Sequence, residues 1–186
     1  NMWVNTGEIP NDKIDNDQNG VIDDKFGFNS ILNTGDPKDD NGHGTLVAGI
    51  IGAVGNNNIG VAGIAWRTQL MAVKFLSEDG NGVITDAVEC INYSRLNGAQ
   101  VINASWSGVG FSQTLLNAIE ETREAGILFV TAAGNFSSDN DLAPLFPASF
   151  VLDNIVSVAS STRKDEVSQF SNFGESTVDI VAPGSA

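Results

Sequence analysis

Short apolar runs alternate with helical patterns along this chain, and the alternation sets its fold class. The helical patterns cover residues 85–96 and the stretch from Ser112 to Gly126. The apolar runs predict strands at residues 70–76, 101–106, 127–130, 155–159 and 178–181. Strands separated by helices of this length form a parallel sheet that is covered on both faces. We therefore predict an α/β fold with a three-layer, doubly wound and mostly parallel sheet.

Composition and charge narrow the functional classes. The formal net charge is −14 at pH 7 and no basic cluster is present, which argues against nucleic-acid binding. No apolar run reaches the roughly 18 residues of a transmembrane helix, so we expect no membrane span. The single cysteine, Cys90, excludes an internal disulfide. It falls within a helical pattern, so we expect a small buried apolar role for it and not a reactive thiol.

His43 is the only histidine of the 186 residues. It stands between Gly42 and Gly44, directly ahead of an apolar helical pattern. Histidine is the side chain best suited to accept and return a proton near neutral pH. Its position alone leaves two interpretations open, a structural histidine or a catalytic base.

The residues around His43 and a series of later segments resemble the motifs of the subtilisin-like serine proteases. These segments occur in the family's own order, and they cover essentially the whole chain. They lie at residues 40–45, 47–49, 56–65, 101–106, 131–135, 146–148, 170–174 and 181–184. The resemblance implies a subtilisin-like fold and a serine endopeptidase that acts on protein or peptide substrates. It also implies a secreted bacterial enzyme, which we expect to be a monomer.

The resemblance further implies roles for individual residues. His43 would be the general base of an Asp-His-Ser triad, and Asn135 would donate a hydrogen bond to the oxyanion. An extended peptide would add as a strand to an edge formed by Ser105, Trp106 and Ser107. The opposite wall of the P1 pocket would be formed by Ala132, Ala133 and Gly134. Considered without the family, Asn135 is also compatible with a simple turn residue, and Trp106 with core packing.

Two members of the triad are not matched. The sequence contains neither the family's Asp-Thr-Gly or Asp-Ser-Gly strand end nor its Gly-Thr-Ser-Met-Ala helix entry. We interpret residues 1–186 as a partial subtilisin-like peptidase domain that lacks the N-terminal Asp segment and the C-terminal Ser segment. We expect this piece by itself to be inactive. The alternative interpretation is a non-catalytic member of the family that binds peptide or calcium.

Acidic and amide side chains between residues 15 and 24 indicate a calcium loop. Oxygen side chains at loop positions 1, 3 and 5 and Gly at position 6 match the start of an EF-hand. Position 12, however, is Phe26 and not Glu, and a solvated acidic turn remains the alternative. The expected ligands are Asp15, Asp17, Asn19, Val21, Asp23 and Asp24. The resemblance implies a second structural calcium site, formed by the Asn57 side chain and the carbonyls of Ile59 and Val61.

Overall fold

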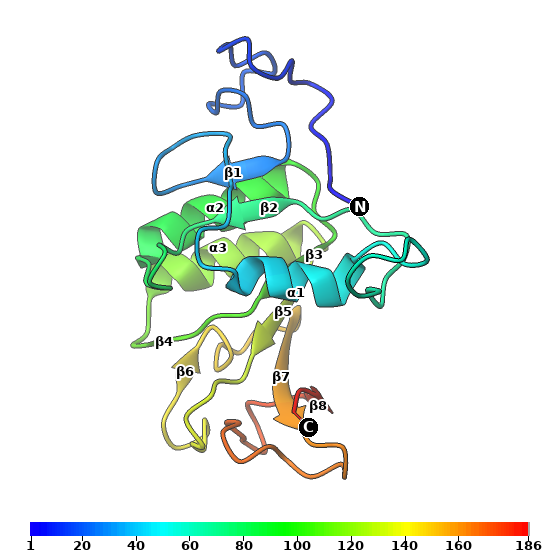
Figure 1. Cartoon of the computed structure of the whole chain (residues 1–186). Coiled ribbons are helices and arrows are strands. Elements are labelled where there is room, and N and C mark those ends of the chain that lie inside the picture. The colour runs from blue at the N-terminus through cyan, green and yellow to red at the C-terminus, as the bar shows by residue number, and fades with distance from the viewer. Residues whose placement is uncertain (186) are drawn as a thin grey trace. The chain divides into compact units, whose positions relative to one another are not determined.

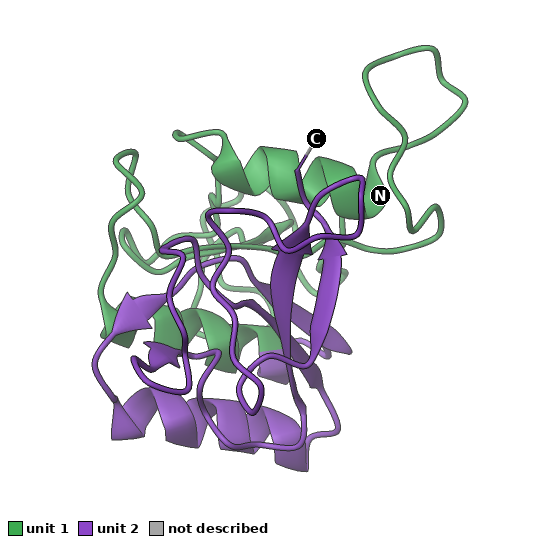
Figure 2. Ribbon diagram, turned by 90° about the horizontal axis from the view of Figure 1, so that it is seen from below, with its two compact units in different colours: residues 1–94 green, residues 95–186 purple. Residues whose placement is uncertain are grey.

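The computed structural model describes residues 1–185 and divides the chain into two compact units. The first unit is Asn1–Ser94 and the second is Arg95–Ala186 (Figure 2). Figure 1 labels the helices and strands of both units along the chain. No helix between residues 1 and 185 has the length and apolar character that crossing a bilayer requires.

The first unit holds two short strands and two helices. Strand β1 (Gly27–Asn29) pairs in parallel with β2 (Ala72–Lys74), and Phe28 lies opposite Val73. The helices are α1 (His43–Gly52) and α2 (Ile84–Leu96), and the last two residues of α2 are assigned to the second unit. The prediction of α2 is confirmed to within one residue. The strand expected over residues 70–76 is shorter, and its residues are half-buried where we expected burial.

The core of the first unit forms between the acidic N-terminal loops and α2. Its buried members are Val21, Phe28, Cys90 and Tyr93. The rings of Phe28 and Tyr93 stack with their centroids 5.1 Å apart. The predicted buried role of Cys90 is confirmed, because its side chain lies inside this cluster.

The second unit is built on a parallel sheet. Its four strands are β3 (Val101–Ala104), β5 (Leu128–Ala132), β7 (Ile155–Ser161) and β8 (Ile180–Pro183), in that spatial order. All neighbouring pairs in this sheet run in parallel, as the alternating pattern predicted. Two further strands, β4 (Gly108–Val109) and β6 (Leu145–Phe146), form a separate antiparallel pair.

Helix α3 (Gln113–Glu124) connects β4 to β5 and packs against β5. It begins where Ser112 caps it, because the Ser112 hydroxyl accepts a hydrogen bond from the Leu115 N–H at 3.3 Å. Its buried residues include Leu115 and Ile119, which recur at helical spacing. Gly126 follows with φ of 73°, a left-handed conformation that ends the helix. The predicted start and stop of this helix are both confirmed.

One expectation for β5 is wrong. The apolar run 127–130 predicted a strand with no face open to solvent, yet the side chain of Leu128 is 41% exposed. Buried residues alternate along β5 with residues that are exposed or half-buried, since neighbouring side chains of a strand point to opposite faces. Phe129 lies on the face that is fully covered, and Leu128 lies on the other.

Candidate active site and metal centre

His43 is the first residue of α1, and a carboxylate upstream organises the start of this helix. Gly42 occupies the cap position in a left-handed conformation with φ of 99° and has no side chain to offer. Asp39 supplies the acceptor, because its carboxylate receives the Thr45 N–H at 2.8 Å and the Thr45 hydroxyl at 2.6 Å. It also accepts from the backbone of Gly42 at 2.8 Å. The Thr45 hydroxyl, followed by these backbone N–H groups, holds the pKa of Asp39 well below its usual range.

The imidazole of His43 is exposed at this helix entry. It makes no hydrogen bond within residues 1–185. Because an exposed imidazole with no internal partner can exchange protons with an external group, its position suits proton transfer.

Asn135 lies three residues after the end of β5 and is exposed at the carboxyl end of the sheet. The preceding residue, Gly134, has φ of 121°, a conformation that side chains rarely adopt. The Asn135 amide has no hydrogen-bond partner in the described part of the chain. It is therefore available to donate to an acceptor outside the chain.

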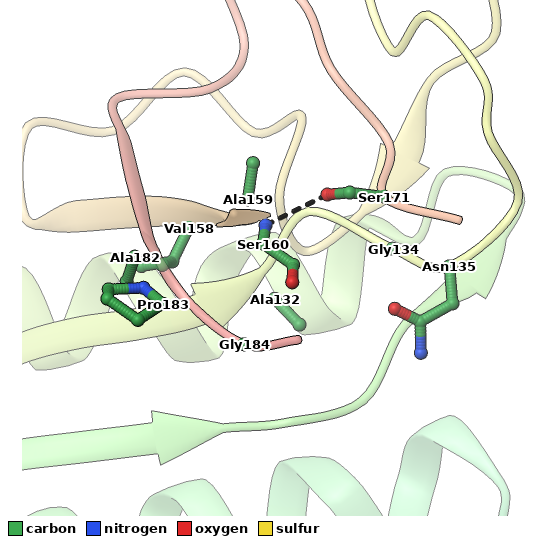
Figure 3. A pocket seen from close by; sticks show the side chains of 10 residues that line it. All are labelled: Ala132, Gly134, Asn135, Val158, Ala159, Ser160, Ser171, Ala182, Pro183 and Gly184. Atoms are coloured by element: carbon green, nitrogen blue, oxygen red, sulfur yellow. Dashed lines mark hydrogen bonds between the residues drawn. The ribbon is translucent and has the colours of Figure 1, made fainter. Parts of the chain in front are cut away.

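A cavity of about 210 Å³ adjoins Asn135. Figure 3 shows the Asn135 side chain at one side of this cavity, next to Gly134. The lining residues come from the carboxyl ends of β5, β7 and β8 and from the loops that follow, namely Ala132, Gly134, Asn135, Val158, Ala159, Ser160, Ser171, Ala182, Pro183 and Gly184. In parallel sheets, ligands bind in the crevice outside the carboxyl ends of the strands. The cavity therefore lies where this fold places binding sites.

Of the residues predicted to bind substrate, some line this cavity and others lie elsewhere. Ala132 and Gly134 line the cavity, whereas the side chain of Ala133 is completely buried. Residues 105–107 are half-buried and lie between β3 and β4, outside both strands. Asn103 donates its amide to the Ser105 hydroxyl at 2.8 Å and so joins this segment to the end of β3. The substrate-binding role of residues 105–107 stays a prediction.

Three carboxylates gather in the first unit. Oxygen atoms of Glu8, Asp17 and Asp24 all lie within 4.8 Å of one another. Glu8 is 3% exposed and Asp24 is 0% exposed, while Asp17 is open to solvent. The Asn5 amide bridges two of them, since it donates to Asp17 and to Asp24 at 2.9 Å each.

No cationic side chain in the described residues 1–185 forms an ion pair with these carboxylates. The ammonium group of Lys25 donates to the backbone carbonyls of Asn5 and Glu8, at 2.9 and 3.1 Å. Burial, the hydrogen bond to Asp24 and the nearby negative charges together raise the pKa of Tyr93, whose hydroxyl donates to Asp24 at 2.5 Å. Buried negative charge with oxygen donors fits a hard divalent cation such as calcium.

The predicted calcium loop contributes only part of this cluster. Asp17 and Asp24 belong to it, whereas the Asp15 carboxylate accepts from the backbone of Asn19 and Gly20. One oxygen of Asp23 is buried without a hydrogen-bond partner. Val21 places its side chain in the hydrophobic core, so that only its carbonyl is suited to a ligand role.

Glu8 was missed by the sequence analysis. It lies upstream of the acidic run, and its carboxylate accepts from the backbone of Asn16, Asp17 and Asp23. A glutamate outside the run carries no local signal that the chain will fold back onto it.

The second expected calcium loop, residues 56–61, is exposed. The Asn57 side chain accepts a hydrogen bond from the Ile59 N–H at 3.0 Å, which forms a local turn. Asn56 and Asn58 both have positive φ angles, as asparagine tolerates in tight turns. The ligand roles of Asn57, Ile59 and Val61 stay predictions.

Comparison with known proteins identifies the class of this chain. Residues 8–186 match the subtilase family, peptidase family S8. The chain therefore belongs to the subtilases, and the resemblance found in its motifs is confirmed.

Its relatives come from distant organisms. Subtilisin-like protease 2 of Plasmodium falciparum is 41% identical over 152 residues, which are 80% of this chain and 11% of that protein. A thermophilic serine proteinase of Bacillus sp. (strain AK1) is 39% identical over 158 residues, which are 85% of this chain and 38% of that protein. The crystal structure of a cold adapted subtilisin-like serine proteinase matches with a TM-score of 0.74 and 35% identity, covering 85% of this chain and 54% of the other. This chain thus spans only part of the length of its relatives.

Proposed function

We propose that the complete protein containing this chain is a serine endopeptidase in which His43 transfers protons and Asn135 stabilises the oxyanion. The observation that carries the proposal is the Asn135 amide, which is exposed after β5 beside a cavity and has no partner within residues 1–185. Family membership supports the reaction class. Protein or peptide substrates follow from that class.

The mechanism assigns a step to each residue. A serine hydroxyl attacks the peptide carbonyl, and His43 accepts the hydroxyl proton and then donates it to the leaving amine. The Asn135 amide donates to the oxygen that becomes negative, where such a bond stabilises the transition state by about 3–4 kcal/mol. Because the serine and aspartate motifs match no residue of this chain, the proposal concerns the complete protein.

Labelling with a fluorophosphonate probe tests this function. The complete protein should react with the probe and hydrolyse a peptide substrate, and His43→Ala should remove both properties. Asn135→Ala should lower kcat by roughly 10²–10³-fold with little change in KM, the size of loss measured when a subtilisin loses its oxyanion-hole amide. A complete protein that folds but neither reacts nor hydrolyses peptides would support the alternative, a non-catalytic subtilase.

We propose that calcium stabilises the first unit through Glu8, Asp17 and Asp24. The clustered carboxylates, which form no ion pair within residues 1–185, support this proposal, and the ion would have a structural role only. Calcium at 100 times its dissociation constant would raise the free energy of unfolding by about 2.7 kcal/mol.

Isosteric variants test the calcium proposal. Glu8→Gln keeps the size of the side chain and removes one charge of the cluster, so it should weaken calcium binding measured by calorimetry. Asp141→Asn is the matched control, because Asp141 also accepts several hydrogen bonds but lies in the second unit. Equal calcium affinity in Glu8→Gln and the unmodified protein would contradict the proposal. Export from the cell, a bacterial source and a monomeric state stay predictions from the resemblance.

A further inference from the structure

We propose that Asn172 is a positioning residue that, through Asn140 and the backbone around residue 135, fixes the Asn135 amide where an oxyanion would form. This inference rests on the proposed oxyanion role of Asn135. It assigns Asn172 no contact with substrate, and its action passes entirely through the loop that carries Asn135.

Asn172 holds the chain on both sides of Asn135. Its backbone N–H donates to the carbonyl of Gly134 at 2.9 Å. Its side-chain oxygen accepts from the N–H of Phe136 at 2.7 Å and from that of Ser138 at 3.3 Å. Backbone groups before and after Asn135 are therefore joined to a single residue that is distant in sequence.

A second amide extends the same network. The Asn172 Nδ2 donates to the Asn140 Oδ1 at 2.8 Å, and the Asn140 Nδ2 donates to the carbonyl of Ala133 at 2.8 Å. Asn172 is 1% exposed and Asn140 is 0% exposed. In this series of bonds each amide both donates and accepts, so one orientation satisfies both side chains. Burial strengthens such bonds and makes an unpaired group costly.

Packing leaves the loop little freedom to move. A Cβ atom added to Gly134 would lie 2.7 Å from the Asn172 Nδ2, so the Asn172 amide packs closely against the backbone that precedes Asn135. The Asn135 side chain itself makes no hydrogen bond to another residue of the part of the chain that the structure describes. Its location is therefore set by the backbone on which it stands, and Asn140 and Asn172 hold that backbone.

The consequence for catalysis follows from preorganisation. An oxyanion donor contributes most when it is already in place before the charge develops. A displacement of about 1 Å at a catalytic group can reduce the rate by roughly 100-fold. Loss of Asn172 should therefore lower kcat through Asn135 and leave substrate binding nearly unchanged.

A double-mutant cycle in the complete protease tests the proposal. Asn172→Ala should lower kcat by about 10- to 100-fold with little change in KM. In an Asn135→Ala background, the same substitution should cause almost no further loss, because the group it positions is already absent. Asn140→Ala, which leaves the bonds of Asn172 to the loop intact, should give a smaller loss that also disappears in that background.

Asn154→Ala is the matched control. Asn154 is a half-buried asparagine of the same unit whose amide donates to Thr122 and to the carbonyl of Ile127, away from the loop. It should leave kcat unchanged. If Asn172→Ala does not fold, the same double-mutant cycle is carried out with Asn140→Ala in place of Asn172→Ala.

Three outcomes would overturn the proposal. The first is an equal loss of kcat in both backgrounds, which would show a general structural role for Asn172. The second is a rise in KM at constant kcat. The third is an Asn135→Ala protein with unchanged kcat. Only this third outcome would also contradict the oxyanion role that the proposed function gives to Asn135, whereas the first two contradict the positioning role of Asn172 alone.

Discussion

Gly134 combines a backbone constraint with a packing constraint at a single residue. Its φ of 121° excludes most side chains, and a Cβ atom would lie 2.6 Å from the Leu145 side chain. Gly110 shares the positive φ, at 92°, but has nothing within 4 Å of its Cβ position. A comparison of Gly110 with Gly134 therefore separates the cost of conformational strain from the cost of steric overlap.

We predict that Gly134→Ala destabilises the protein by clearly more than Gly110→Ala. Strain from positive φ should cost each variant about 1–2 kcal/mol, and overlap should add about 1–3 kcal/mol to Gly134→Ala alone. Urea unfolding of both variants measures the difference. Equal losses would show that Leu145 and Asn172 move aside at little cost.

At the scale of an element, the start of α1 depends on Asp39 and not on its own cap residue. Asp39 lies four residues before the first residue of the helix, and its carboxylate accepts the N–H of Thr45. A negative charge here also interacts favourably with the positive end of the helix dipole. Because His43 is the first residue of α1, the same carboxylate orders the backbone of the proposed catalytic base.

We predict that Asp39→Ala destabilises the first turn of α1 by about 1 kcal/mol at neutral pH. The pKa of Asp39 is lower in the folded chain than its ordinary value of 3.8. Its contribution is therefore complete above pH 3.8 and is lost as the pH falls toward the folded value. Hydrogen exchange of the Thr45 and Leu46 amides, measured across this range, should show the difference narrowing with acidification.

Asp40→Ala provides the comparison for this prediction. Asp40 neighbours Asp39 in sequence, but it forms an exposed ion pair with Lys74 at 2.6 Å. Such pairs contribute roughly 0–1 kcal/mol, so the same amides should exchange nearly as in the unmodified protein. A larger effect for Asp40→Ala than for Asp39→Ala would refute the capping role.

At the scale of the whole molecule, local signals were sufficient for helix α3 and for the parallel direction of the strands in the second unit. Ser112 and Gly126 mark the ends of α3 through contacts that span only a few residues. The apolar runs indicated buried strands, and the helical patterns between them indicated connections long enough for parallel pairing. The ordered motifs were sufficient to match the segments that contain His43 and Asn135 to those of the family, from the sequence alone.

Contacts between distant residues were not predictable in this way. Asn140 and Asn172 are 32 residues apart, and no periodicity indicates that their amides meet. Glu8 joins Asp24 only because the acidic loops fold back on themselves. The exposed side of β5 also escaped prediction, since an apolar run does not show which of its faces will be covered.

Because Cys90 is buried, the rate at which its thiol is labelled measures how often the core of the first unit opens. Cys90 is the only thiol, and desolvation raises its pKa to about 11, so a thiol reagent at neutral pH reacts only when the core opens. Tyr93 lies in the same core and bonds to Asp24 of the carboxylate cluster. We predict that calcium slows the labelling of Cys90, and that Glu8→Gln reduces this protection. Equal rates of Cys90 labelling in calcium and in a chelator would contradict the prediction, because they would show that calcium does not stabilise this core.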